Sequence, residues 1–158
     1  MTTAAALAVT ATLLTVSVPA GAAPRVKATC AVLTGNAGKT TDKLSSCTPA
    51  ADNGGNAAGV TKAGKGTTGT VTLKWAGNHG TTTLTYSYKI VTTNPKCGTS
   101  VVKGKKTNNI EVTETGTVTA STGTAAKDIK VGDATSATVC VNAATSAESL
   151  LKGTKFVL

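Results

Sequence analysis

The chain has 158 residues, and its 16 Lys and Arg against 7 Asp and Glu give a formal net charge of +9. This length suits one domain, since domains typically contain about 100 to 150 residues. Aromatic residues make up only 3% of the chain, so its core must consist mainly of small and β-branched side chains. His79 is the only histidine, which leaves few bases for acid–base catalysis.

The N-terminus carries an uncharged apolar run from Ala4 to Val18. This run is shorter than the roughly 20 residues that a helix needs to cross a bilayer. The small residues Ala20 to Ala22 form an A-x-A cleavage pattern, and Pro24 disfavours a continuing helix. We expect a signal peptide at 1–22 and one secreted domain at 23–158, without a transmembrane segment. The alternative is an N-terminal core helix.

Most of the remaining chain alternates Thr and Val with period two, which is typical of half-buried β-strands. The clearest strand is Gly69 to Trp75, with Val, Leu and Trp on one face. Turn-forming residues at Gly77 to Gly80 separate it from a second run, Thr81 to Thr92, so these runs predict a β-hairpin. Further expected strands are Arg25 to Leu33, Lys43 to Thr48, Ser100 to Lys103, Asn109 to Ala120, Ala134 to Asn142 and Thr154 to Leu158.

These strands predict an all-β fold with almost no helix. We expect a single antiparallel β-sandwich or partly closed β-barrel of about seven or eight strands. Between them, Pro49 to Gly66 is almost wholly Ala, Gly, Asn, Thr and Lys, and we expect a long mobile loop there. Ser121 to Gly132 is expected to form either a loop or an irregular edge strand.

The four cysteines are Cys30, Cys47, Cys97 and Cys140. In an exported chain they are expected to pair as disulfides. A zinc site is the alternative, but it favours short C-x-x-C knuckles, which this sequence lacks. Four cysteines allow three pairings. We expect the sequential one, because Cys30 with Cys47 and Cys97 with Cys140 would each close a local unit.

No motif in the sequence predicts catalysis. His79 lies in the expected hairpin turn and no serine occupies a G-x-S-x-G setting, so a solvated turn residue is favoured over a catalytic triad. Glu111 and Glu114 are three positions apart, which places them on opposite faces of a strand, and we expect them to be exposed charges on an edge strand. We expect no enzyme activity, metal or cofactor, since calcium-loop, phosphate-loop and dinucleotide motifs are absent from the sequence.

The positive charge is the one global feature that indicates a partner. Lys62 and Lys65 lie in the expected loop, and Lys103, Lys105 and Lys106 cluster in an expected turn. Such residues attract anionic polymers, for example envelope phosphates or acidic glycans. The alternative is a solvated face that only promotes solubility.

The segment Tyr86-Ser87-Tyr88-Lys89 is the nearest approach to the alternating aromatic and basic residues of nucleic-acid interfaces. Both tyrosines share a face with Leu84 and Ile90, so core packing explains them better and nucleic acid is not the expected partner. The same face would alternatively line the cavity of a small-ligand β-barrel.

Four short motifs carry a resemblance: T-C-x-V-L-T-G from Thr29 to Gly35, S-x-C-T from Ser45 to Thr48, V-C-V from Val139 to Val141, and L-x-x-G-T-K-F from Leu150 to Phe156. With them the chain resembles the small uncharacterised exported β-proteins of actinobacteria. The resemblance implies an extracellular β-domain with paired cysteines, and it implies no catalytic or binding residue.

The sequence thus predicts a secreted, non-enzymatic, disulfide-linked β-domain, extracellular or associated with the cell envelope. We expect it to bind an anionic cell-envelope polymer. Two alternatives remain: a structural envelope or spore-coat protein, and, less favoured, the small-ligand β-barrel.

Overall fold

The computed structural model describes residues 28–37, 41–48, 57–63 and 67–158, with residues 41 and 57–63 described by their backbone. The expected signal peptide at 1–22 lies outside the described residues. The strands are β1 Thr29–Asn36, β2 Thr41–Thr48, β3 Ala57–Ala63, β4 Thr68–Trp75, β5 Thr81–Ile90, β6 Thr99–Val102, β7 Lys105–Ser121, β8 Ala134–Asn142, β9 Ala147–Leu150 and β10 Phe156–Val157. Two short 3-10 helices, η1 Ala76–Asn78 and η2 Gly123–Lys127, complete the described elements.

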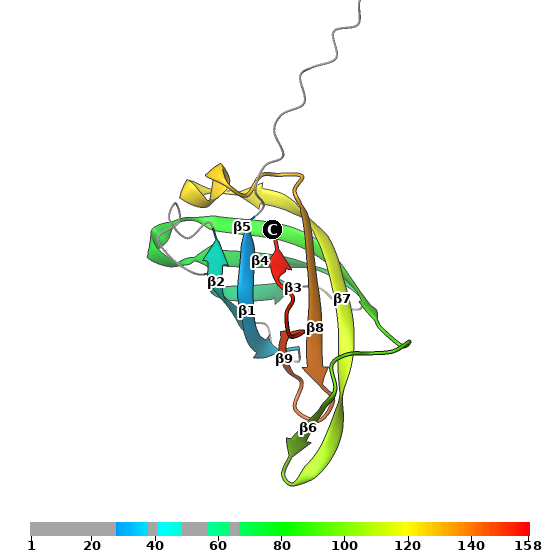
Figure 1. The fold of residues 1–158 in the computed structure, drawn as a ribbon. Coiled ribbons are helices and arrows are strands. Elements are labelled where there is room, and N and C mark those ends of the chain that lie inside the picture. Colours follow the sequence, from blue (N-terminus) through cyan, green and yellow to red (C-terminus); the bar gives the residue numbers. More distant parts are fainter. Residues whose placement is uncertain (1–27, 38–40, 49–56, 64–66) are drawn as a thin grey trace, which may run out of the picture.

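The strands form one antiparallel sheet that curves back towards its own start (Figure 1). β1 to β5 pair in chain order, β5 pairs with β7, and β7 pairs with β8. β8 then pairs with β9 and β10, and both of these pair with β1. Pairing of β2 with β3 is limited to Thr41↔Thr61 and Asp42↔Val60 in the described register. The sheet is therefore partly ring-like, and the predicted all-β, antiparallel fold is confirmed.

The core lies inside this curved sheet because alternate residues of each strand point inward. Val71, Leu73 and Trp75 of β4 are buried, as their alternation predicted. The Trp75 indole Nε1 donates a hydrogen bond to Thr82 Oγ1 at 2.9 Å, which satisfies its polar atom inside the core. The largest fully buried apolar side chains elsewhere are Leu44, Leu84, Val118, Ile129, Val139 and Leu158. Small aliphatic residues thus supply most of the core.

The predicted disulfides are both present with the expected connectivity. Cys30 and Cys47 face each other in register on β1 and β2, 17 positions apart in sequence. Cys97 precedes β6 and is linked to Cys140 of β8 across a separation of 43. The first bridge joins neighbouring strands. The second ties the irregular segment before β6 to the body of the sheet.

The expected loop from Pro49 to Gly66 is wrong for residues 57–63, which form β3. Six residue pairs join β3 to β4, from Ala57↔Trp75 to Ala63↔Thr70. The sequence of β3, A-A-G-V-T-K-A, lacks an alternation of large apolar residues. The sequence of β3 therefore does not indicate a strand by itself, and β3 is held by its backbone pairing with β4, whose apolar and polar residues alternate clearly. β9 was also not predicted, which explains why ten strands are described where seven or eight were expected.

The segment from Ser121 to Gly132 is neither of the expected forms, because it contains the 3-10 helix η2. Ala125 in η2 and Ile129 just after it are both fully buried. The Ala125 N–H donates to His79 O at 3.0 Å, which attaches this segment to the β4–β5 turn. Its apolar side chains complete the core beside that turn.

Candidate functional site

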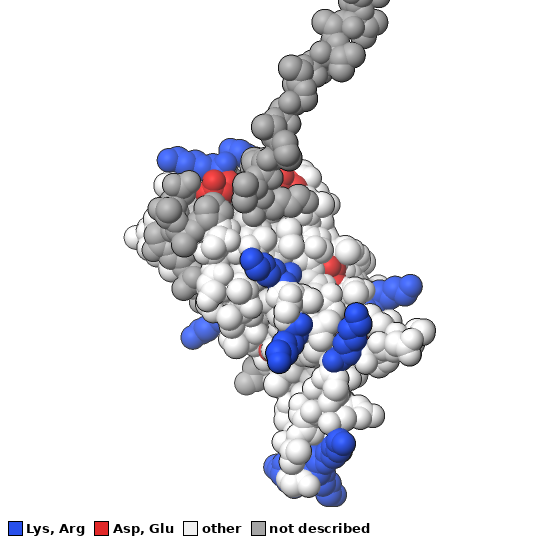
Figure 2. Space-filling view, viewed as in Figure 1, with Lys and Arg blue, Asp and Glu red and all other residues white. Residues whose placement is uncertain are grey.

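The charges of the protein are sorted between its interior and its surface. Every lysine whose side chain is described is exposed: Lys43, Lys74, Lys89, Lys96, Lys103, Lys105, Lys106, Lys127, Lys130, Lys152 and Lys155. Among the six described acidic residues, Asp42, Glu111 and Glu148 are buried, and Glu114, Asp128 and Asp133 are half-buried. Figure 2 accordingly shows many blue side chains and few red atoms on the face in view. Ammonium groups are therefore the most exposed charges of the described surface.

The most prominent cluster of lysines lies at the tip of the β6–β7 hairpin, which we call the lysine arm (residues 99–108). Its strands pair from Thr99↔Asn108 to Val102↔Lys105, leaving Lys103 and Gly104 as a two-residue turn. Both turn residues have positive φ, 48° and 73°, as a type I′ hairpin turn requires. The arm projects from the body of the sheet, and Lys103, Lys105 and Lys106 cluster at its end (Figures 1 and 2).

The two flanking lysines lie on opposite faces of the arm. Lys105 is in register with Val102, and Lys106 is in register with Val101. Because neighbouring residues of a strand point to opposite faces, the positive charge surrounds the tip. Val101 is 74% exposed beside Lys106. The tip thus presents three ammonium groups and one apolar side chain to solvent.

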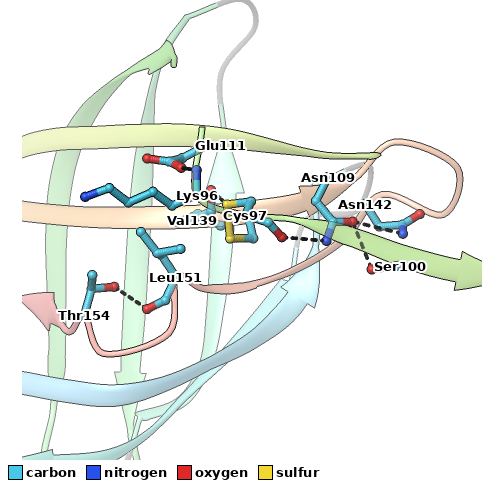
Figure 3. Close-up of a disulfide and its surroundings, with 10 residues drawn as sticks. Lys96, Cys97, Ser100, Asn109, Glu111, Val139, Asn142, Leu151 and Thr154 are labelled. Atoms are coloured by element: carbon cyan, nitrogen blue, oxygen red, sulfur yellow. Dashed lines mark hydrogen bonds between the residues drawn. A yellow bond between two sulfur atoms is a disulfide. The ribbon is translucent and has the colours of Figure 1, made fainter. Parts of the chain in front are cut away.

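A hydrogen-bonded network fixes the base of the lysine arm (Figure 3). The Asn109 side chain donates from Nδ2 to Cys97 O at 3.1 Å. Its Oδ1 accepts from Ser100 Oγ at 3.0 Å and from Asn142 Nδ2 at 3.2 Å. The Cys97–Cys140 disulfide lies beside this network. One side chain therefore links β6, β7 and the end of β8, which holds the arm in a defined direction.

Glu111 belongs to the same region, and its predicted role was wrong. It is only 7% exposed, and its Oε2 accepts a hydrogen bond from the Lys96 backbone N–H (Figure 3). The Glu111 carbonyl also accepts from the Val91 N–H at 2.9 Å. β7 is not an edge strand here, because it pairs with β5 on one side and β8 on the other. Glu111 orders the 91–98 segment instead of protecting an exposed edge.

Glu114 is also not an exposed edge charge, since it lines a small interior cavity of about 30 Å³. Asp42, Glu148 and Tyr86 line the same space together with apolar side chains. A water molecule occupies about 30 Å³ in the liquid, so this space is sized for water and not for an organic ligand. The cavity that these described residues line is thus too small for the ligand of the small-ligand alternative. Among the described residues, no group of three or more His, Cys, Asp and Glu is arranged to hold a metal ion.

His79 has a structural contact that the sequence did not indicate. Its Nδ1 lies 2.8 Å from Thr124 Oγ1, and the ring is half-buried. This contact joins the β4–β5 turn to η2, so the predicted turn position of His79 is confirmed, while its ring is half-buried and not fully solvated. A stabilising link between two loops accounts for the position of this histidine.

The structure brings only some of the lysines that the sequence indicated into one cluster. Lys103, Lys105 and Lys106 gather at the arm tip. Lys62 lies in β3, where only the backbone is described, and Lys65 lies outside the described residues. The sequence did not indicate Lys74 and Lys89 as part of a binding surface, although both occupy outward-facing positions in the alternation of their strands. The anchoring role of Asn109 and Asn142 was not predicted either, because the sequence gives no local signal for it.

No known family model, curated protein or solved structure matches this chain. The described part of the chain contains no helix that is both long and apolar enough to cross a bilayer. The functional argument therefore depends on the charges and geometry of the chain itself.

Proposed function

We propose that this protein is a secreted, non-enzymatic β-domain that binds an anionic polymer of the cell envelope, with the lysine arm as the leading contact. The observation that carries the proposal is the sorting of charge: the described lysines are exposed, whereas the described carboxylates are buried or half-buried. Exposed ammonium groups approach a polyanion more closely than the carboxylates beneath the surface do, so attraction exceeds repulsion at contact distance. The two disulfides agree with an oxidising, extracellular compartment.

The position of the lysine arm favours it as the first point of contact. Attraction between exposed charges extends over a Debye length, about 8 Å at physiological ionic strength. Three lysines at the end of a projecting hairpin reach an extended polymer before the lysines on the body do. The rigid base supplied by Asn109 and the Cys97–Cys140 bridge lowers the entropy lost when the arm is held against a ligand.

The backbone of Lys103 gives independent support for a role of this residue. A side chain at φ 48° is in the left-handed region, where Asn or Gly is favoured and other residues are strained by about 1 to 2 kcal/mol. Lysine is therefore not the residue that the turn itself prefers. Its charge at the extreme tip explains its presence better than local folding does.

The experiment compares two variants that lose the same charge. In the arm variant, Lys103, Lys105 and Lys106 are changed to Gln. In the control, Gln replaces three exposed lysines from separate places: Lys43, Lys127 and Lys152. Binding to purified cell envelopes and to polyphosphate is measured across a salt series. We expect wild-type binding to weaken steeply with salt, because ionic contacts release counterions.

We expect the arm variant to lose affinity and its logarithmic salt slope to fall by about two to three, near one unit per lost contact. The control variant is expected to lose much less. Equal losses would contradict the leading role of the arm. No binding by the wild type at any salt concentration would refute the proposal and favour a structural envelope protein, which sedimentation would reveal as self-assembly.

A further inference from the structure

The outward face of β4, β5 and β7 carries rows of hydroxyl groups that the strand register aligns. One row crosses the strands as Thr70, Thr85 and Thr117, which are register partners. The next row is Thr68, Ser87 and Thr115, also in register, with Ser87 Oγ 3.3 Å from Thr115 Oγ1. Neighbouring strands lie about 4.8 Å apart, so each row offers a hydroxyl at this interval. The alignment comes from pairing between distant segments.

These two rows border a shallow hollow of about 600 Å³ in the protein surface. Between them runs a third row of register partners, Gly69, Tyr86 and Gly116. The Tyr86 side chain packs against the core, and the glycines have no side chain, so this row contributes backbone to the outward face. A Cβ at Gly116 would lie 2.1 Å from Thr85 O, so close approach of β5 and β7 requires glycine here. The hollow is wide open to solvent, so a ligand would lie along the sheet across the rows and not inside an enclosed pocket.

Two lysines lie beyond the hydroxyl rows on the same face. Lys89 follows Ser87 by two positions in β5, and Lys74 follows Thr72 by two positions in β4, so alternation directs both outward. Both are exposed. The carboxylates of β7 do not oppose them on this face, because Glu111 is buried and Glu114 lines the interior cavity. The lining of the hollow is therefore uncharged, and positive charge lies beyond it in both directions, with Lys89 two positions after Ser87 and Lys74 four positions after Thr70.

We propose that this hollow binds an acidic polysaccharide; the inference rests on the proposed function and names the class of polymer. Threonine and serine hydroxyls both donate and accept hydrogen bonds, which matches the hydroxyl groups of a sugar chain. The threonine methyl groups contact the apolar faces of the sugar rings. Carboxylates carried by the polymer interact with Lys74 and Lys89. A plain polyphosphate would satisfy the lysines but not the rows of hydroxyls.

The test uses mannuronate oligosaccharides, neutral mannan oligosaccharides as the uncharged counterpart, and polyphosphate. The hollow variant carries Thr85→Val and Thr117→Val, which remove two hydroxyls and keep a β-branched shape. The matched control carries Thr34→Val and Thr48→Val, at exposed positions of β1 and β2. Affinities are measured by calorimetry. Amide shifts of Gly69, Tyr86 and Gly116 are followed during titration of the wild type, which needs no variant.

We expect mannuronate to bind more tightly than mannan, and the hollow variant to bind mannuronate about tenfold more weakly, since it loses two hydrogen bonds. Its polyphosphate affinity and both affinities of the control variant are expected to stay unchanged. Wild-type mannuronate affinity in the hollow variant, or unshifted Gly69 and Gly116 amides, would overturn the inference. If polyphosphate still bound through the lysine arm, the proposed function would survive that result.

Discussion

The disulfide between Cys97 and Cys140 offers the sharpest test of how the lysine arm is anchored. Changing both residues to Ala opens a covalent loop with a separation of 43 positions. In the chain-entropy model, a loop of this length stabilises the folded state by about 4 kcal/mol through its effect on the unfolded chain. Both cysteines are half-buried, so the substitution removes little packing and the entropy dominates.

The free energy of unfolding is measured in urea under non-reducing conditions, with Trp75 as the fluorescent reporter. Trp75 is the only tryptophan and is buried in the core, so its emission follows global unfolding. The Cys30–Cys47 bridge remains intact in this variant and keeps the other covalent loop closed. We expect a loss of about 4 kcal/mol, within the usual range of 2 to 5 for small secreted domains.

A loss below about 1 kcal/mol would refute this reasoning, because loop closure would then contribute much less than the chain-entropy model predicts. Contacts that remain at the base of the arm include the Asn109 side-chain bonds, the Glu111 bond to the Lys96 N–H and the backbone bond from the Asn109 N–H to Gly98 O. These would then hold the 91–98 segment without the bridge. Hydrogen exchange at Lys96 and Asn109 distinguishes this case from a general change in the unfolded state.

Three further predictions concern single side chains. Lys103→Asn is expected to raise the free energy of unfolding by up to about 1 kcal/mol, since Asn tolerates φ 48°. The same change is expected to weaken polyanion binding. A lower stability of this variant in urea would contradict the turn assignment. Gly116→Ala is expected to lower the free energy of unfolding by about 1 to 3 kcal/mol, because the added Cβ would overlap Thr85 O. An unchanged urea midpoint would disprove the close approach of β5 and β7 at this position. Thr82→Val is expected to lower the free energy of unfolding by about 1 to 3 kcal/mol and to shift the fluorescence emission of Trp75, because the buried indole N–H loses its acceptor. Unchanged emission and stability would count against that hydrogen bond.

Part of the candidate site was readable from the sequence. The sequence predicted that Lys103, Lys105 and Lys106 cluster in a turn between two strands, and the structure has a hairpin there. Its type I′ turn is shorter than expected, because Lys105 and Lys106 already belong to β7. The hydroxyl hollow was not readable in this way. Thr70, Thr85 and Thr117 lie on three different strands, and only the register brings them into one row. A shift of one residue would turn every side chain of a strand to the other face.

The environment of Glu111 also could not be predicted from the sequence. Its sequence context, a carboxylate among Thr and Val, equally suits an exposed strand position. Its burial follows from β8 pairing on one side of β7 and from the 91–98 segment crossing nearby, where the Lys96 N–H needs an acceptor. Both neighbours lie many residues away from Glu111 in the sequence, so the local alternation that predicts a strand contains no information about them. The same holds for β3, whose pairing with β4 outweighs its weak intrinsic pattern.

The sequence by itself determined the all-β class, the β4–β5 hairpin and the positive charge, because alternation, turn residues and composition are local properties of the chain. It also indicated the disulfide pairing, since cysteines close in sequence order most readily close local units. Only the tertiary structure decided which charges face solvent, which hydroxyls align and where the lysine arm is anchored. These depend on strand order and register, and both are set by contacts between residues far apart in the sequence.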